Sequence, residues 1–102
     1  MEYIVVFITA PNEEEAAKIG TAIVTEGLVK CVNIIRNIRS IYQWKGNIED
    51  HSEVLIIAKT KKEKFAALSL AVKSLHSYEV PEIVAIPIAD GSTDYLNWLG
   101  SL

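Results

Sequence analysis

Cysteine is almost absent from this chain of 102 residues, since Cys31 is the single one. One thiol excludes a disulfide within the chain and is typical of a reducing compartment, so we expect a cytoplasmic protein. The five glycines are scattered, and no glycine-rich loop of the kind that binds phosphate groups is present. A Cys-x-x-Cys pair for soft metals and a serine-hydrolase nucleophile elbow are also missing. These absences favour a protein that is not an enzyme.

Basic residues are few, because 10 Lys and Arg stand against 13 Asp and Glu and give a net charge of −3. The densest basic cluster, Lys61, Lys62 and Lys64, is too small for a phosphate-binding surface, so we expect no nucleic acid as a partner. Apolar runs such as residues 3–8 are far shorter than the roughly 20 residues of a membrane helix, so we expect no membrane contact. Half of the residues are hydrophobic, which predicts one ordered domain over residues 1–102.

The spacing of apolar residues predicts the order of strands and helices. β-branched and aromatic runs predict strands over residues 3–10, 28–44, 48–58 and 79–89. Helical spacing predicts one helix after Asn12 and another after Thr60, and each has a glutamate three positions later in a capping-box pattern. A short third helix is predicted after Ser92, with Leu96, Trp98 and Leu99 facing inward. A bulge is expected near Ile34 and Ile35, and residues 45–47 are expected to form a hairpin turn.

This order predicts an α+β fold, a ferredoxin-like βαββαβ sandwich with a short C-terminal helix. Two helices then cover one face of a four-stranded antiparallel sheet, and the other face is solvated, with alternating apolar and polar residues. Residues 3–8, 54–58 and 83–89 instead contain no charged residue on either side of the predicted strands. Since a large exposed apolar surface marks an interface, we expect a homo-oligomer. The alternative is that the last helix and the loops cover the second face.

Two aromatic residues lie two positions apart near the predicted hairpin turn. Tyr42 and Trp44 therefore share one face of their strand. They are expected either to anchor an interface with a neighbouring subunit or to line a pocket between subunits.

Residues 76–82, with the sequence His-Ser-Tyr-Glu-Val-Pro-Glu, join the second helix to the fourth strand. One interpretation is that His76 interacts with the negative end of the helix dipole. The other is a metal site of His76 with Glu79 or Glu82 and with Cys31 from elsewhere, because imidazole, carboxylate and thiolate together suit copper or zinc. One chain offers few such ligands, so a subunit boundary would have to supply the remainder.

Charged residues on the third strand allow two further interpretations. Glu49, His51 and Glu53 alternate along one face and form either a weak cation site or, as we prefer, a solvated sheet edge. Lys59 follows the apolar run and either points into a cleft, where it would bind an anion, or is an ordinary surface charge.

Several segments resemble the CutA family of divalent-cation tolerance proteins. They are Leu-Val-Lys-Cys-Val-Asn-Ile at 28–34, Ser-Ile-Tyr-Gln-Trp at 40–44, Glu-Val-Leu-Ile-Ile-Ala-Lys-Thr at 53–60, His-Ser-Tyr-Glu-Val-Pro-Glu at 76–82 and Tyr-Leu-Asn-Trp at 95–98. The resemblance extends over essentially the whole chain, in order and with the spacing of the family.

The resemblance implies a non-enzymatic, cytoplasmic homotrimer that acts in tolerance of copper and other divalent ions. It implies no required cofactor beyond a divalent cation such as copper or zinc, and it matches Cys31 and His76 to the family's cysteine and histidine. The ligand site would lie in clefts between subunits, around Tyr42, Trp44, Lys59, His76, Glu79 and Glu82. Two alternatives remain, a PII-like signalling trimer that binds a small anionic ligand through Lys59 and a purely structural trimeric scaffold.

Overall fold

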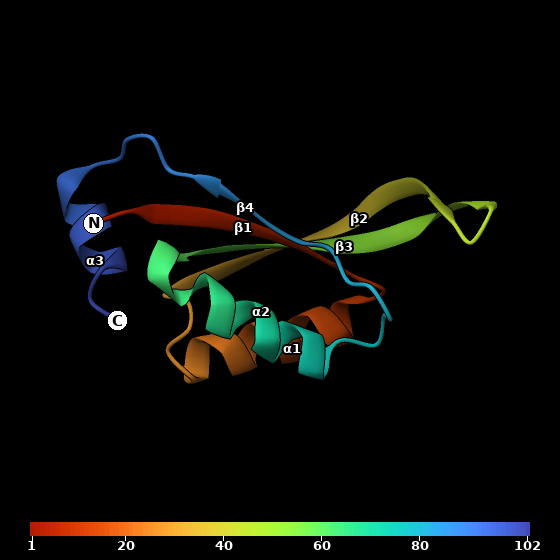
Figure 1. The fold of residues 1–102 in the computed structure, drawn as a ribbon, viewed down its shortest axis with the longest axis horizontal. Helices are drawn as coiled ribbons and strands as arrows, with labels where there is room; N and C mark the ends of the chain where they lie inside the picture. Colours follow the sequence, from red (N-terminus) through yellow and green to blue (C-terminus); the bar gives the residue numbers. More distant parts are fainter.

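The structure, a computed structural model, describes residues 1–102 as a four-stranded antiparallel sheet with two helices across one face (Figure 1). The elements are β1 (Tyr3–Ala10), α1 (Glu13–Thr25), β2 (Cys31–Trp44), β3 (Asn47–Lys61), a 3₁₀ turn (Lys62–Lys64), α2 (Phe65–Leu75), β4 (Ile83–Pro87) and α3 (Thr93–Leu99). The strand order β2-β3-β1-β4 is that of a βαββαβ ferredoxin-like sandwich, and the predicted α+β class is confirmed. None of the helices has both the length and the hydropathy needed to cross a membrane.

The core lies between the sheet and the helices α1 and α2. Alternate residues of the central strands β1 and β3 point into it, and the helices add side chains spaced three or four residues apart. The largest fully buried apolar side chains of this layer are Val6, Ile8, Ile19, Ile23, Val29, Ile56, Leu68 and Val72. Burial of each such side chain contributes about 1.5–3 kcal/mol to stability.

The opposite side of the sheet, here called the helix-free face, is also apolar. Directly paired residues of antiparallel strands point to the same side, and the register gives this face Val5, Phe7, Ile35, Leu55, Ile57, Val84 and Ile86. The side chains of Ile35, Val84 and Ile86 are 46%, 51% and 53% exposed. Helix α3 lies at one end of the sheet, beside the N-terminus, and leaves most of this face uncovered (Figure 1).

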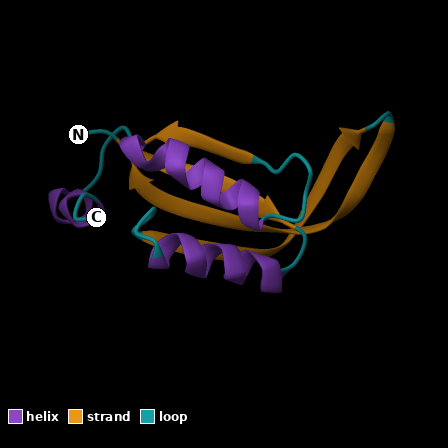
Figure 2. Cartoon of the chain, turned by 60° about the horizontal axis from the view of Figure 1, so that its bottom comes forward, coloured by secondary structure: helices purple, strands orange, loops and turns teal.

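The outer halves of β2 and β3 form a long two-stranded extension, here called the hairpin arm (residues 38–52). A bulge between Ile35 and Ile38, with Asn37 at φ 59°, bends the ladder where the arm begins. Figure 2 shows the arm rising away from the plane of the sheet. Its turn has two residues, Lys45 and Gly46, both with positive φ, as in a type I′ turn. The expected bulge is thus present and begins at Ile35, and the turn is one residue shorter than predicted.

Three local predictions are wrong. Strand β3 continues to Lys61, and α2 begins at Phe65 without a side-chain cap, because Thr60 is buried and donates to the Leu28 carbonyl at 2.8 Å. The fourth strand covers only Ile83–Pro87, since residues 77–80 form a bend and residues 81–82 join no strand. Trp98 does not face inward, since it is 45% exposed and the Lys30 ammonium lies 5.3 Å from the centre of its ring.

The cap of α1 gives a direct test of helix energetics. Asn12 accepts a hydrogen bond from the Glu15 backbone N–H at 2.8 Å, whereas the Glu15 side chain bonds elsewhere, so only half of the capping box forms. We expect Asn12→Ala to lower the free energy of unfolding by about 1 kcal/mol and Asn12→Ser to change it little. Urea unfolding at fixed protein concentration measures both, and equal stability of the two variants would contradict this role.

Candidate functional site

A cleft of about 740 Å³ lies between the hairpin arm and the segment that links α2 to β4. The arm contributes aromatic side chains, and the linking segment contributes carboxylates. Among the lining residues are Tyr42, Trp44, Glu53, Tyr78, Glu79 and Glu82. The sequence-predicted cleft residues Tyr42, Trp44 and Glu82 therefore come together with Glu79, whereas Lys59, His76 and Cys31 do not line this cleft.

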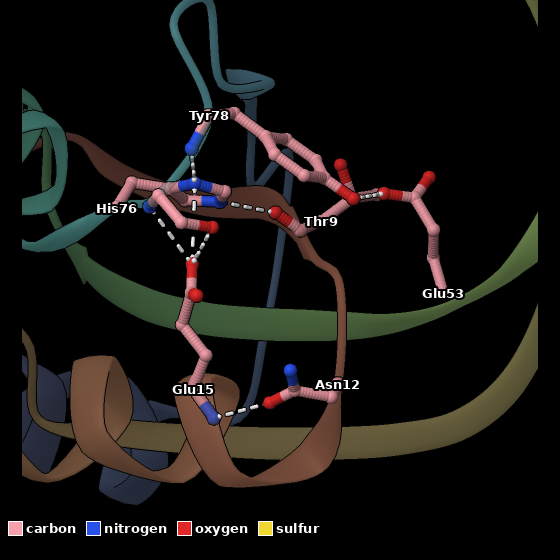
Figure 3. Close-up of polar contacts among 7 residues, drawn as sticks. Thr9, Asn12, Glu15, Glu53, His76 and Tyr78 are labelled. Atoms are coloured by element: carbon pink, nitrogen blue, oxygen red, sulfur yellow. Dashed lines mark hydrogen bonds and ion pairs between the residues drawn. The ribbon is translucent and has the colours of Figure 1, made fainter.

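His76 holds the linking segment against the end of β1. Its ring Nδ1 accepts a hydrogen bond from the Tyr78 backbone N–H at 3.0 Å, so Nε2 carries the proton and donates to the Thr9 carbonyl at 2.7 Å (Figure 3). The side chain has no exposed surface. His76 forms the C-cap of α2, as its predicted position at the helix end requires, and within one chain both ring nitrogens have partners.

Glu15 ties the same segment to α1. One carboxylate oxygen accepts hydrogen bonds from both the backbone N–H and the hydroxyl of Ser77, each at 3.0 Å. This is why the Glu15 side chain does not return to the N-cap of its own helix. The linking segment is therefore fixed to the end of α1 by Glu15 and to the end of β1 by His76 (Figure 3).

Tyr78 connects the linking segment to the base of the hairpin arm. Its hydroxyl donates to Glu53 at 2.5 Å, a short charge-assisted hydrogen bond (Figure 3). Partial burial, together with this bond and the negative charge of Glu53, raises the pKa of the Tyr78 phenol well above its ordinary value. Tyr78 therefore stays protonated at any physiological pH and remains the donor.

The charged stripe of β3 has a more specific role than a solvated edge. Glu49, His51 and Glu53 do share one face, as predicted, but Glu53 is buried, and His51 instead bonds the Tyr42 hydroxyl at 2.7 Å. Loss of hydration, with the charges of Glu53 and Glu49, raises the pKa of Tyr42. On the other face of the arm, Arg39 and Asp50 form a bidentate pair at 2.7 and 2.9 Å.

The tip of the arm reaches the linking segment through Lys45. Its ammonium lies 5.4 Å from the centre of the Trp44 ring and 3.4 Å from a carboxylate oxygen of Glu79. One cation thus lies between an aromatic ring and a carboxylate that both line the cleft.

Cys31 and Lys59 lie at the other end of the sheet. The Lys59 ammonium contacts Asn33 and lies 3.8 Å from the Cys31 sulfur. Burial, with the neighbouring Cys31 thiol, raises the pKa of Tyr95 on α3. Cys31 pairs with Lys59, whereas Thr9, which binds His76, pairs with Leu55, so the two ends are about 13 Å apart along β3. Within one chain no three His, Cys, Asp or Glu side chains are close enough to hold a metal ion.

Sequence reasoning missed Glu53 and Tyr78 as parts of the cleft. Glu53 looked like the last member of a solvated stripe, although it directly precedes the apolar run that begins at Val54. A carboxylate adjoining a fully buried strand is a usable signal of a buried acid. Nothing in the sequence indicated that Tyr78 would be its partner.

The family model described as "CutA1 divalent ion tolerance protein" matches residues 4–101 of this chain. The "Divalent-cation tolerance protein CutA" of Thermus thermophilus is 50% identical over 95 residues, which are 93% of this chain and 92% of that protein. "Protein CutA" of Homo sapiens is 47% identical over 91% of this chain. The chain spans about half of that protein, 52% of its length.

Solved structures of similar proteins have the same fold. The divalent cation tolerance protein (Cut A1) of Thermus thermophilus superposes with a TM-score of 0.93 at 48% identity, covering 96% of this chain and 95% of that one. CutA1 of Oryza sativa superposes with a TM-score of 0.94 at 41% identity, covering 97% and 91%. The likeness therefore includes the sheet, the helices and the arm that frame the cleft.

Proposed function

Because the chain belongs to the CutA1 family of divalent ion tolerance proteins, we propose that it is a non-enzymatic, cytoplasmic homotrimer that binds divalent metal ions at the boundaries between its subunits. The helix-free face is the observation that carries this proposal. Its apolar side chains include three that are about half exposed in the single chain. A contiguous apolar surface of this kind is typical of an interface between protein chains.

The assembly is the first part of the proposal. Each large apolar side chain that passes from water into an interface adds about 1.5–3 kcal/mol when fully buried, and a partly buried one adds less. The three half-exposed residues contribute most and the four partly buried ones contribute less, and together they oppose the entropy lost on association, which is estimated at about 4–15 kcal/mol. A second copy supplies an equally apolar face, so self-association is the simplest way to cover this surface.

Metal binding between subunits is the second part. Cys31, His76 and Glu79 supply the thiolate, imidazole and carboxylate groups that suit zinc and copper. Since Cys31 and the Thr9 end of β1 that holds His76 are about 13 Å apart along β3, a joint site needs donors from more than one copy. His76 already has a partner on each ring nitrogen, so Cys31 and Glu79 are the donors more readily available.

Calorimetric titration with Cu(II) and Zn(II) tests the metal-binding part. We expect binding by the unmodified chain and a loss of at least about tenfold in affinity for Cys31→Ser or Glu79→Gln, because even changes to groups around metal ligands weaken binding 10- to 100-fold. Glu14→Gln is the matched control, since Glu14 is exposed and makes no ion pair. Absence of binding for both ions would contradict the proposal. Binding of a small anion instead, lost in Lys59→Met, would favour a PII-like signalling protein.

A further inference from the structure

Two side chains of β3 carry unpaired charges on the same side of the sheet as the helix-free face. Residues alternate between the two sides of a strand, so the side that holds Ile57 also holds Glu53 and Lys59. None of the six ion pairs of the chain includes Glu53 or Lys59. One carboxylate and one ammonium therefore have no opposite charge on the surface that other copies of the chain are proposed to cover.

Glu53 has only half of its carboxylate paired. The residue is 4% exposed, and one of its oxygens accepts a hydrogen bond from the Tyr78 hydroxyl (Figure 3). The other oxygen has no protein partner, yet no fully buried polar side-chain atom of the chain lacks one, so this oxygen reaches the surface. Removal of a carboxylate from water is costly, and one hydrogen bond from a tyrosine offsets only part of that cost.

Lys59 is half-buried and has only neutral neighbours. Its ammonium contacts the Asn33 side chain and lies 3.8 Å from the Cys31 sulfur. These contacts leave the positive charge uncompensated. When another copy covers this face, the ammonium loses its remaining water, and a buried charge then needs an opposite charge beside it.

The two charges cannot meet within one chain. Six positions along β3 separate Glu53 from Lys59, which is about 20 Å at about 3.3 Å per residue. An ion pair needs its nitrogen and oxygen atoms within about 4 Å of each other. The only other lysine or arginine that the strand register places on this side is Lys61, which already pairs with Glu63 at 3.5 Å. Lys59 is therefore the cation of this face that remains available to Glu53 of another copy.

We propose that the carboxylate of Glu53 in one copy forms an ion pair with the ammonium of Lys59 in the next copy. The inference rests on the proposed assembly and adds the charged contact that orients it. Burial of apolar surface is not directional, whereas a pair of opposite charges fixes which end of one sheet meets which end of the next. A contact between two different residues is also heterologous, so it can be repeated around a closed ring of copies.

A double-mutant cycle on the assembly tests the ion pair. Glu53→Gln keeps the shape and can still accept from Tyr78, and Lys59→Met removes the charge but keeps an unbranched apolar side chain. Light scattering over a dilution series, in urea that partly dissociates the unmodified chain, gives the dissociation constant. We expect each single variant to raise this constant at least about tenfold, because it leaves the opposite charge buried and unpaired. The double variant should be no weaker than the weaker single variant.

The distance within one chain makes this result specific. Changes at sites more than about 7–10 Å apart usually have additive effects, so a loss of the Tyr78 contact and a loss of the Asn33 contact would simply add. Only a contact between copies makes the double variant stronger than that sum. Glu49→Gln combined with Lys59→Met is the matched control, because Glu49 lies on the same side of β3, four positions from Glu53. We expect this control pair to depart from additivity by less than twofold.

Two results of the cycle would overturn the inference. One is additive effects of Glu53→Gln and Lys59→Met, and the other is a larger coupling of Lys59 with Glu49 than with Glu53. Circular dichroism checks that each variant is folded. A crystal structure of the unmodified assembly needs no variant, and absence of Lys59 from ion-pair distance of Glu53 in another copy would also overturn the inference.

Failure of this inference differs from failure of the proposed assembly. A stable trimer whose variants are additive would remove the ion pair and leave the assembly in place. An unmodified chain that stays monomeric would contradict both, and the molar mass alone identifies that case.

Discussion

Ile57→Asp should dissociate the assembled protein into smaller species, whereas Ile56→Asp, one residue earlier, should prevent folding. The two residues point to opposite faces of β3. Ile57 belongs to the helix-free face, where a buried charge in every subunit costs several kcal/mol per copy in the assembly. Ile56 is fully buried under the helices. There the lost packing of about 2–5 kcal/mol and an unpaired charge together approach the whole stability of a small domain, about 5–15 kcal/mol.

Light scattering at about 10 µM and circular dichroism separate the two effects. Leu70→Asp is the matched control, because Leu70 is an exposed apolar residue on the outer side of α2. We expect Leu70→Asp to keep both the mass and the spectrum of the unmodified chain. An Ile57→Asp variant with unchanged mass would contradict the proposed interface. An Ile56→Asp variant that remains folded would contradict the placement of Ile56 in the core.

His76→Ala should lower the free energy of unfolding by about 3 kcal/mol even when no metal is present. The substitution leaves the Thr9 carbonyl and the Tyr78 N–H without partners, and each buried unsatisfied group costs about 1–3 kcal/mol. Urea unfolding in EDTA at fixed protein concentration measures this change.

Glu15→Gln is the comparison for His76→Ala. A glutamine amide oxygen can still accept from Ser77, so we expect a loss below about 1 kcal/mol. If His76→Ala unfolded at the same urea concentration as the unmodified chain, the histidine would not be holding the linking segment. A loss of stability that appears only with added metal would instead indicate that His76 is a metal ligand.

Much of the fold was predictable because its elements repeat simple patterns. The apolar runs at residues 3–8 and 54–58 predicted two-sided strands, and the helix-free face confirms that both sides are apolar. In such a continuous run, the sequence does not indicate which alternate residues point toward the helices. The strand register was therefore needed to place Ile56 on the helix side and Ile57 on the helix-free face. The predicted start of α2 was wrong, because the Thr60 hydroxyl donates to the buried Leu28 carbonyl and does not cap a helix.

The cleft was predictable only in part. Tyr42 and Trp44 could be placed together by their spacing on a strand, and Glu79 and Glu82 by their position after His76. The roles of His76 and Glu53 depend on contacts between segments far apart in the sequence, namely with Thr9 and with Tyr78. Local patterns carry no information on such contacts, which arise when β1, β3 and the linking segment meet.

The molar mass of the unmodified chain, measured by light scattering at low micromolar concentration, tests most directly whether copies of the chain cover the helix-free face. We predict three times the 11.3 kDa of one chain, with no decrease on dilution through this range. A folded, stable species of 11.3 kDa would contradict the account, because its apolar second face would then remain in water.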